Sequence, residues 1–112
     1  MIHFKENEFK MGNELVFDMM NSVLLESLDE LRERVGEPLI VTSSYRSIEY
    51  NKIVGGAENS LHLSGNAVDL SCNNGILRSK IVFNALSLGL TVGVASGFIH
   101  VDNRNLQILF TY

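Results

Sequence analysis

Four side chains near the middle and the end of this sequence are suited to binding a metal ion and hydrolysing a bond. His62 and Asp69 lie seven positions apart in one stretch, and His100 and Asp102 lie in another. Two imidazoles and one carboxylate (His62, Asp69 and His100) match the three protein ligands of a catalytic Zn²⁺, whose fourth position stays open for water. Calcium prefers more oxygen ligands, and magnesium rarely binds two imidazoles. The donor set therefore favours one zinc ion.

Both stretches alternate in the way that is typical of β-strands. In residues 67–72 the apolar side chains Val68, Leu70 and Cys72 share one face and leave Asp69 on the other. In residues 98–102, His100 and Asp102 lie opposite two apolar residues. Buried charge is costly unless it is paired or coordinated, so donors that converge on one cleft predict a bound partner. The alternative is a metal-free structural domain.

Length and composition indicate one ordinary globular domain, residues 1–112. Hydrophobic residues make up 46% of the chain and charged residues 20%, with a formal net charge of −4. This charge favours neither a nucleic-acid partner nor an anionic membrane surface. The single cysteine, Cys72, excludes an intrachain disulfide and is expected to be buried. We expect no membrane insertion, because no segment has the ~20 apolar residues that a spanning helix needs, and we expect a monomer.

The first residues contain no apolar run of signal-peptide type. We therefore expect synthesis in the cytoplasm. A target outside the producing cell would then require another exit route, such as lysis or carriage in a phage particle.

The elements that must position the donors follow from periodicity and from turn residues. The spacing predicts a long amphipathic helix over Glu14–Val35, capped by Asn13, and a second helix over Arg78–Leu88. Strands are predicted over residues 39–44, 67–72, 91–95, 98–102 and 106–110, the last at an edge. The predicted fold is α+β: a small, mainly antiparallel sheet with two helices packed on one face and the zinc site on the other.

The motif around the first two donors resembles a known family. Ser60-x-His62-x-x-Gly65-x-Ala67-x-Asp69-Leu70 is similar to the signature of the M15 zinc peptidases, which include D-Ala-D-Ala carboxypeptidases and other peptidoglycan peptidases. Three more segments resemble parts of the same family, and the resemblance extends from about residue 4 to about residue 104. They are Ser43–Ser47, Asn51 with the loop Val54–Ala57, and Phe98–Asp102.

The resemblance implies a hedgehog/DD-peptidase-like fold and a zinc metallopeptidase that hydrolyses a peptide bond in bacterial peptidoglycan, as a carboxypeptidase or an endolysin-type endopeptidase. It implies that His62, Asp69 and His100 bind the zinc. It also implies that Arg46 binds the substrate and stabilises its developing oxyanion, a role that suits a fixed guanidinium. Ser60 is expected to bond near the metal or the substrate. The alternative for Arg46 is a surface ion pair.

The general base is where the sequence departs from the better-known branches of that family. Those branches carry a glutamate three residues before the last histidine ligand, or a histidine two before it, whereas this chain has Gly97 and Phe98 there. Asp102 is the candidate base, because two strand residues span roughly 6.6 Å and share a face. The alternative role for Asp102 is to orient His100 or Arg46, and Glu58 is a weaker candidate base. The missing standard base leaves a second function open, a zinc-containing cell-wall-binding domain without catalysis.

Overall fold

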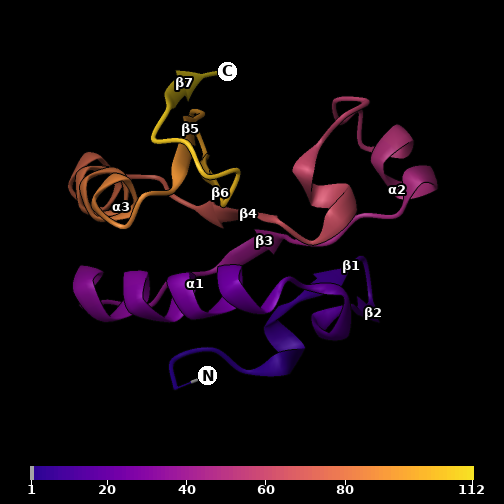
Figure 1. Cartoon of the computed structure of the whole chain (residues 1–112), viewed down its shortest axis with the longest axis horizontal. Coiled ribbons are helices and arrows are strands. Elements are labelled where there is room, and N and C mark those ends of the chain that lie inside the picture. The colour runs from indigo at the N-terminus through magenta and orange to yellow at the C-terminus, as the bar shows by residue number, and fades with distance from the viewer. Residues whose placement is uncertain (1) are drawn as a thin grey trace.

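The computed structural model describes residues 2–112, which form an α+β fold around a five-stranded sheet (Figure 1). The strand order is β3-β4-β6-β5-β7, and only the β5–β7 pair is parallel. The predicted, mainly antiparallel sheet is therefore confirmed, as is the edge position of the last strand. The strands are β3 (Val41–Ser43), β4 (Ala67–Ser71), β5 (Thr91–Val94), β6 (Phe98–Asp102) and β7 (Leu109–Thr111).

Two helices, α1 (Ser22–Val35) and α3 (Gly75–Ser87), pack together and contribute one layer of the core. Figure 1 shows α1 running beneath the sheet and α3 beside its β5 and β6 end. The sheet contributes the even-numbered side chains of β4 and the odd-numbered side chains of β6 to the same core, as the alternation in the sequence predicts. Fully buried core residues of the two layers include Leu24, Leu28, Leu31, Val68, Leu70, Ile81, Ile99 and Val101.

The first helix begins later than the sequence predicts. Residues 10–19 instead form a short hairpin, β1 (Lys10–Met11) and β2 (Glu14–Leu15), and a 3₁₀ turn, η2 (Phe17–Met19). Gly12 adopts φ 62° in the hairpin turn, a conformation that glycine tolerates well. Asn21, not Asn13, caps α1, since its side chain accepts a hydrogen bond from the Leu24 N–H at 3.0 Å.

Apolar residues before the cap still reach the core, without being helical. Val16 and Met20 are buried, and so are Phe4 and Phe9 of the lead-in that contains η1 (Glu6–Glu8). Val16 and Met20 continue the apolar spacing of α1, which explains why periodicity alone placed the helix start too early.

The other side of β4 carries a segment of short helical turns. It contains α2 (Ile48–Ile53) and η3 (Leu61–Ser64), and in Figure 1 it lies away from α1. Across the sheet, strand register aligns one residue of each strand in a row: Ser43, Asp69, His100, Gly93 and Phe110. Two of the predicted metal ligands are thus direct cross-strand neighbours. Among residues 2–112, no helix has the length and apolar character required to cross a bilayer.

Candidate metal centre

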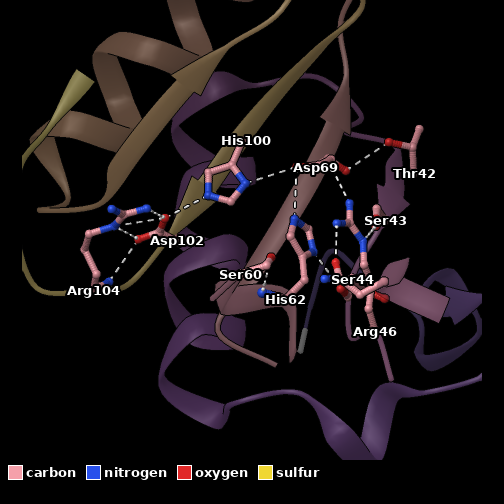
Figure 2. A network of polar contacts seen from close by, with 11 residues as sticks. Thr42, Ser43, Ser44, Arg46, Ser60, His62, Asp69, His100, Asp102 and Arg104 are labelled. Atoms are coloured by element: carbon pink, nitrogen blue, oxygen red, sulfur yellow. Dashed lines mark hydrogen bonds and ion pairs between the residues drawn. The ribbon is translucent and has the colours of Figure 1, made fainter. Parts of the chain in front are cut away.

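Three predicted ligands converge on one point of the sheet face opposite α1. One donor atom each from His62, Asp69 and His100 lies within 4.8 Å of the other two. Oδ1 of Asp69 is 3.3 Å from Nε2 of His62 and 3.2 Å from Nδ1 of His100 (Figure 2). All three residues are buried. The two stretches singled out in the sequence are therefore brought together by the β4–β6 pairing and by the turn that precedes β4.

The turn η3 fixes the first imidazole. Ser60 caps it, since its hydroxyl accepts from the His62 N–H at 3.2 Å, and the Arg46 N–H binds the His62 carbonyl at 2.9 Å. Nδ1 of His62 lies 2.7 Å from the carbonyl oxygen of Ser44. A carbonyl can only accept, so Nδ1 must donate, and a neutral His62 then has its lone pair on Nε2, the atom that faces Asp69.

The second imidazole is fixed in the same way by a carboxylate. Nε2 of His100 donates to Oδ2 of Asp102 at 2.7 Å, which leaves the lone pair of a neutral ring on Nδ1, facing Asp69 (Figure 2). Arg104 holds Asp102 through its backbone N–H at 3.1 Å, its Nε at 3.0 Å and its Nη2 at 2.6 Å. Both oxygens of Asp102 therefore accept hydrogen bonds from His100 or Arg104, and the side chain is fully buried.

The ligand carboxylate has an outer partner as well. Oδ1 of Asp69 faces the two imidazoles, whereas Oδ2 accepts from Nη2 of Arg46 at 3.2 Å. The other nitrogens of Arg46 are also held, Nε by the Ser43 hydroxyl at 3.0 Å and Nη1 by Oδ1 of Asn51 at 3.2 Å. Arg46 is therefore no surface ion pair but a guanidinium fixed in place beside the site.

Both carboxylates are held ionised. Burial raises the pKa of Asp69, but hydrogen bonds from His100 and His62 outweigh it and lower that pKa to about 2. Burial likewise raises the pKa of Asp102, and its bonds to His100 and Arg104 lower it to about 2. Burial lowers the pKa of His100, yet its bonds to Asp102 and Asp69 raise it overall. The centre thus attracts positive charge, whether protons or a metal ion.

An open cavity of about 690 Å³ gives access to the three donors. Arg46 and Ser60, both predicted to meet substrate, line it. Asp102 lies beneath it, on the far side of the His100 ring from Asp69. Glu58, the weaker candidate base, is exposed and outside the cavity lining. The cavity is within the usual size range of small-ligand sites.

The donors fit a metal ion. With neutral rings, two nitrogen lone pairs face the same carboxylate oxygen, and only a cation or added protons between them can remove their repulsion. Each donor also has an outer partner that turns its free atom inward, the arrangement typical of protein metal sites. Those partners are the Ser44 carbonyl, Asp102 and Arg46.

Sequence reasoning missed Arg104, and it gave no role at the site to Asn51 or to Gly56. Arg104, between the predicted strands 98–102 and 106–110, is the main partner of Asp102. Asn51 holds Arg46 and also binds the Ala57 carbonyl at 2.9 Å, which joins the loop to the site. A Cβ on Gly56 would lie 2.0 Å from Oδ1 of Asn51, so glycine is required there for packing. These contacts join residues that are two to six positions apart, but side-chain hydrogen bonds in turns and loops produce no hydrophobic periodicity, so only the structure identifies them.

Comparison with known families identifies the family to which this chain belongs. A family model described as Peptidase M15 matches residues 2–102, a span that includes His62, Asp69, His100 and Arg46. No curated protein matches the chain. Since the matched region covers most of the sequence, this chain belongs to the peptidase M15 family.

Proposed function

We propose that this protein is a zinc-dependent metallopeptidase that hydrolyses a peptide bond in bacterial peptidoglycan, as a carboxypeptidase or as an endopeptidase. Membership of a peptidase family supports hydrolysis of a peptide bond. The peptidoglycan substrate rests on the similarity of the Ser60–Leu70 motif to enzymes of that specificity.

The donor set, two imidazoles and one carboxylate within 4.8 Å of one another, is the observation that supports the choice of zinc. Tetrahedral zinc with nitrogen and oxygen ligands at ~2.0 Å separates neighbouring donor atoms by roughly 3.3 Å. Oδ1 of Asp69 lies 3.3 Å from the His62 nitrogen and 3.2 Å from the His100 nitrogen. Zinc bound there would polarise the scissile carbonyl and lower the pKa of water at its open position.

The chain's own residues would bind and orient the substrate. Arg46 uses three of its five N–H groups on Ser43, Asn51 and Asp69, and the remaining two can reach a carbonyl oxygen or a carboxylate in the cavity. Because it is fixed beforehand, it can stabilise a developing oxyanion without reorganising. Ser60 would complete the same wall, although its hydroxyl already caps the His62 turn.

Asp102 fits the role of a positioning residue better than that of a base. A general base works best with a pKa near the operating pH, whereas the pKa of Asp102 is lowered to about 2 by His100 and Arg104. Its carboxylate also lies behind the His100 ring, fully buried. We therefore assign Asp102 to holding His100 with its Nδ1 lone pair inward.

Digestion of defined muropeptides tests the proposal. Zinc-loaded protein is incubated with cross-linked and uncross-linked muropeptides, and products are identified by mass spectrometry. We expect release of D-Ala or of a peptide fragment, loss of that release with a chelator, and its return with zinc. His62→Ala serves as the inactive control. Intact muropeptides after incubation with the fully zinc-loaded protein would contradict the proposed hydrolysis.

One observation keeps a second function in view, a zinc-containing domain that binds cell wall without cutting it. Gly97 and Phe98 offer no ionisable group where related enzymes carry a base, and Asp102 is already engaged. This alternative predicts saturable muropeptide binding, measured by calorimetry, with no product in the digestion.

A further inference from the structure

Three aromatic side chains form one wall of the cavity beside the metal centre. We call Phe98, Phe110 and Tyr112 the aromatic wall; all three line the cavity. The Tyr112 ring lies 5.1 Å from that of Phe98 and 5.5 Å from that of Phe110, between centroids. Phe110 in turn lies 5.7 Å from the His100 ring. The wall therefore begins directly at a metal ligand.

The row of residues across the sheet explains how Phe110 comes so close. Gly93 pairs with His100 on one side and with Phe110 on the other. A Cβ on Gly93 would lie 2.4 Å from the Phe110 ring, so the ring occupies the space that a side chain would fill. Arg104 covers the ring as well, with its guanidinium carbon 5.8 Å from the centroid.

The outer part of the wall faces the cavity and not the core. Tyr112 is 68% exposed and Phe98 is only partly buried, although the Tyr112 N–H binds the Val94 carbonyl at 3.1 Å and fixes the backbone. The facing wall is different in character, since it carries Arg46 and the loop Val54–Ala57. A ligand that spans the cavity thus meets Arg46 and this loop on one side and, on the other, the rings of Phe98 and Tyr112, with Arg104 lying against Phe110.

We propose that the aromatic wall is a specificity subsite, which binds an apolar aliphatic side chain on the substrate residue next to the scissile bond. This inference rests on the proposed function. An aliphatic group placed there loses water contact against Phe98 and Tyr112 while the neighbouring carbonyl reaches the metal centre. Phe110 and Tyr112 lie beyond residues 2–102, so this part of the subsite comes from outside the region that matches the family.

Hydroxamates test the subsite without requiring turnover, because the hydroxamate group binds zinc and its tail reaches the surroundings. The binding of acetohydroxamate and of isocaprohydroxamate, which has a branched aliphatic tail, is measured by calorimetry on the zinc-loaded protein. We expect the branched compound to bind roughly tenfold more tightly, as burial of a few methylene groups implies.

The variants Phe98→Ala and Tyr112→Ala, singly and together, should reduce that preference and leave the affinity for acetohydroxamate and the zinc content unchanged. Phe83→Ala is the matched control, since Phe83 is 70% exposed on α3 and lies outside the cavity lining. A preference that survives in the double variant would overturn the subsite, and so would equal binding of both compounds by the native protein. Failure of both compounds to bind, together with no bound zinc, would instead contradict the proposed metal centre.

Discussion

The carboxylate of Asp102 binds Nε2 of His100 at 2.7 Å, on the opposite side of the imidazole from Asp69. A carboxylate in this position fixes the tautomer of the ring and increases the basicity of the ligating nitrogen. It also stands apart from the cavity in which a substrate would bind. This geometry favours a role for Asp102 in orienting His100 over a role as the general base.

Replacement of Asp102 by asparagine should weaken zinc binding by about 10–100-fold, because the amide loses the charge that holds His100. The affinity can be measured by competition with a chromophoric chelator. Asp29→Asn is a suitable control, as Asp29 accepts hydrogen bonds from the backbone N–H groups of Ile2 and His3 and is remote from the centre. Unchanged zinc affinity with a large loss of kcat would instead identify Asp102 as the base.

Removal of a ligand should abolish metal binding. His62→Ala and His100→Ala are each expected to bind no stoichiometric zinc, measured by elemental analysis after dialysis, and to lose the rise in Tm that zinc gives the native protein. That rise corresponds to roughly 4 kcal/mol at a zinc concentration a thousand times Kd. His3→Ala should bind zinc normally, since His3 pairs with Glu33 on the far side of α1. Normal zinc content in the His62 variant would refute the site.

Arg46→Ala should retain zinc but lose turnover by a factor of about 10²–10³, the usual cost of removing an oxyanion donor. Steady-state kinetics on a muropeptide substrate would measure it. Arg34→Ala, which removes an exposed helix ion pair with Glu30, is the control. Full turnover in the Arg46 variant would show that its role is only to hold Asp69.

Gly56→Ala should impair catalysis with little effect on zinc. The new Cβ would lie 2.0 Å from Oδ1 of Asn51 and 2.8 Å from Nη1 of Arg46, so both side chains must shift. We expect kcat to fall while zinc affinity changes less than for Asp102→Asn. Gly75→Ala is the matched control, because a Cβ there meets no atom within 4 Å. Native kinetics for Gly56→Ala would argue against a requirement for the Arg46 position.

The zinc-free protein should lose stability as the pH falls from about 4 to about 2. The pKa of Asp102 drops from 3.8 to about 2 on folding, so its contribution is complete above 3.8 and is lost as the folded form is protonated. That contribution is on the order of 2 kcal/mol. Urea unfolding at several pH values in a chelator measures it, and Asp102→Asn should make the profile shallower, with Asp69, whose pKa is also lowered to about 2, contributing the rest. Parallel profiles would contradict the ionised, hydrogen-bonded state of Asp102.

Local pattern was sufficient where a segment's own residues decide its structure. The alternation in residues 67–72 and 98–102 predicted the two central strands and which faces their side chains share. It failed at the start of α1, where Gly12 and Asn21 override an apolar spacing that looks helical. A glycine-containing turn and an asparagine cap are local signals, so this error could have been avoided from sequence.

Contiguous residues were enough to select His62, Asp69 and His100 as candidate donors, because the spacing of the first two and the motif around the third are local properties. What surrounds them depends on how the chain folds. The Ser44 carbonyl and Phe110 reach the centre through chain crossing and strand register, which depend on the packing of the whole domain. Arg104 is only two residues from Asp102, but the orientation of its side chain is set by the turn after β6. A hydrogen bond such as that between Arg104 and Asp102 leaves no repeating pattern in the sequence from which it could be predicted. For that reason the sequence could name Asp102 as important, yet only the fold places it behind His100.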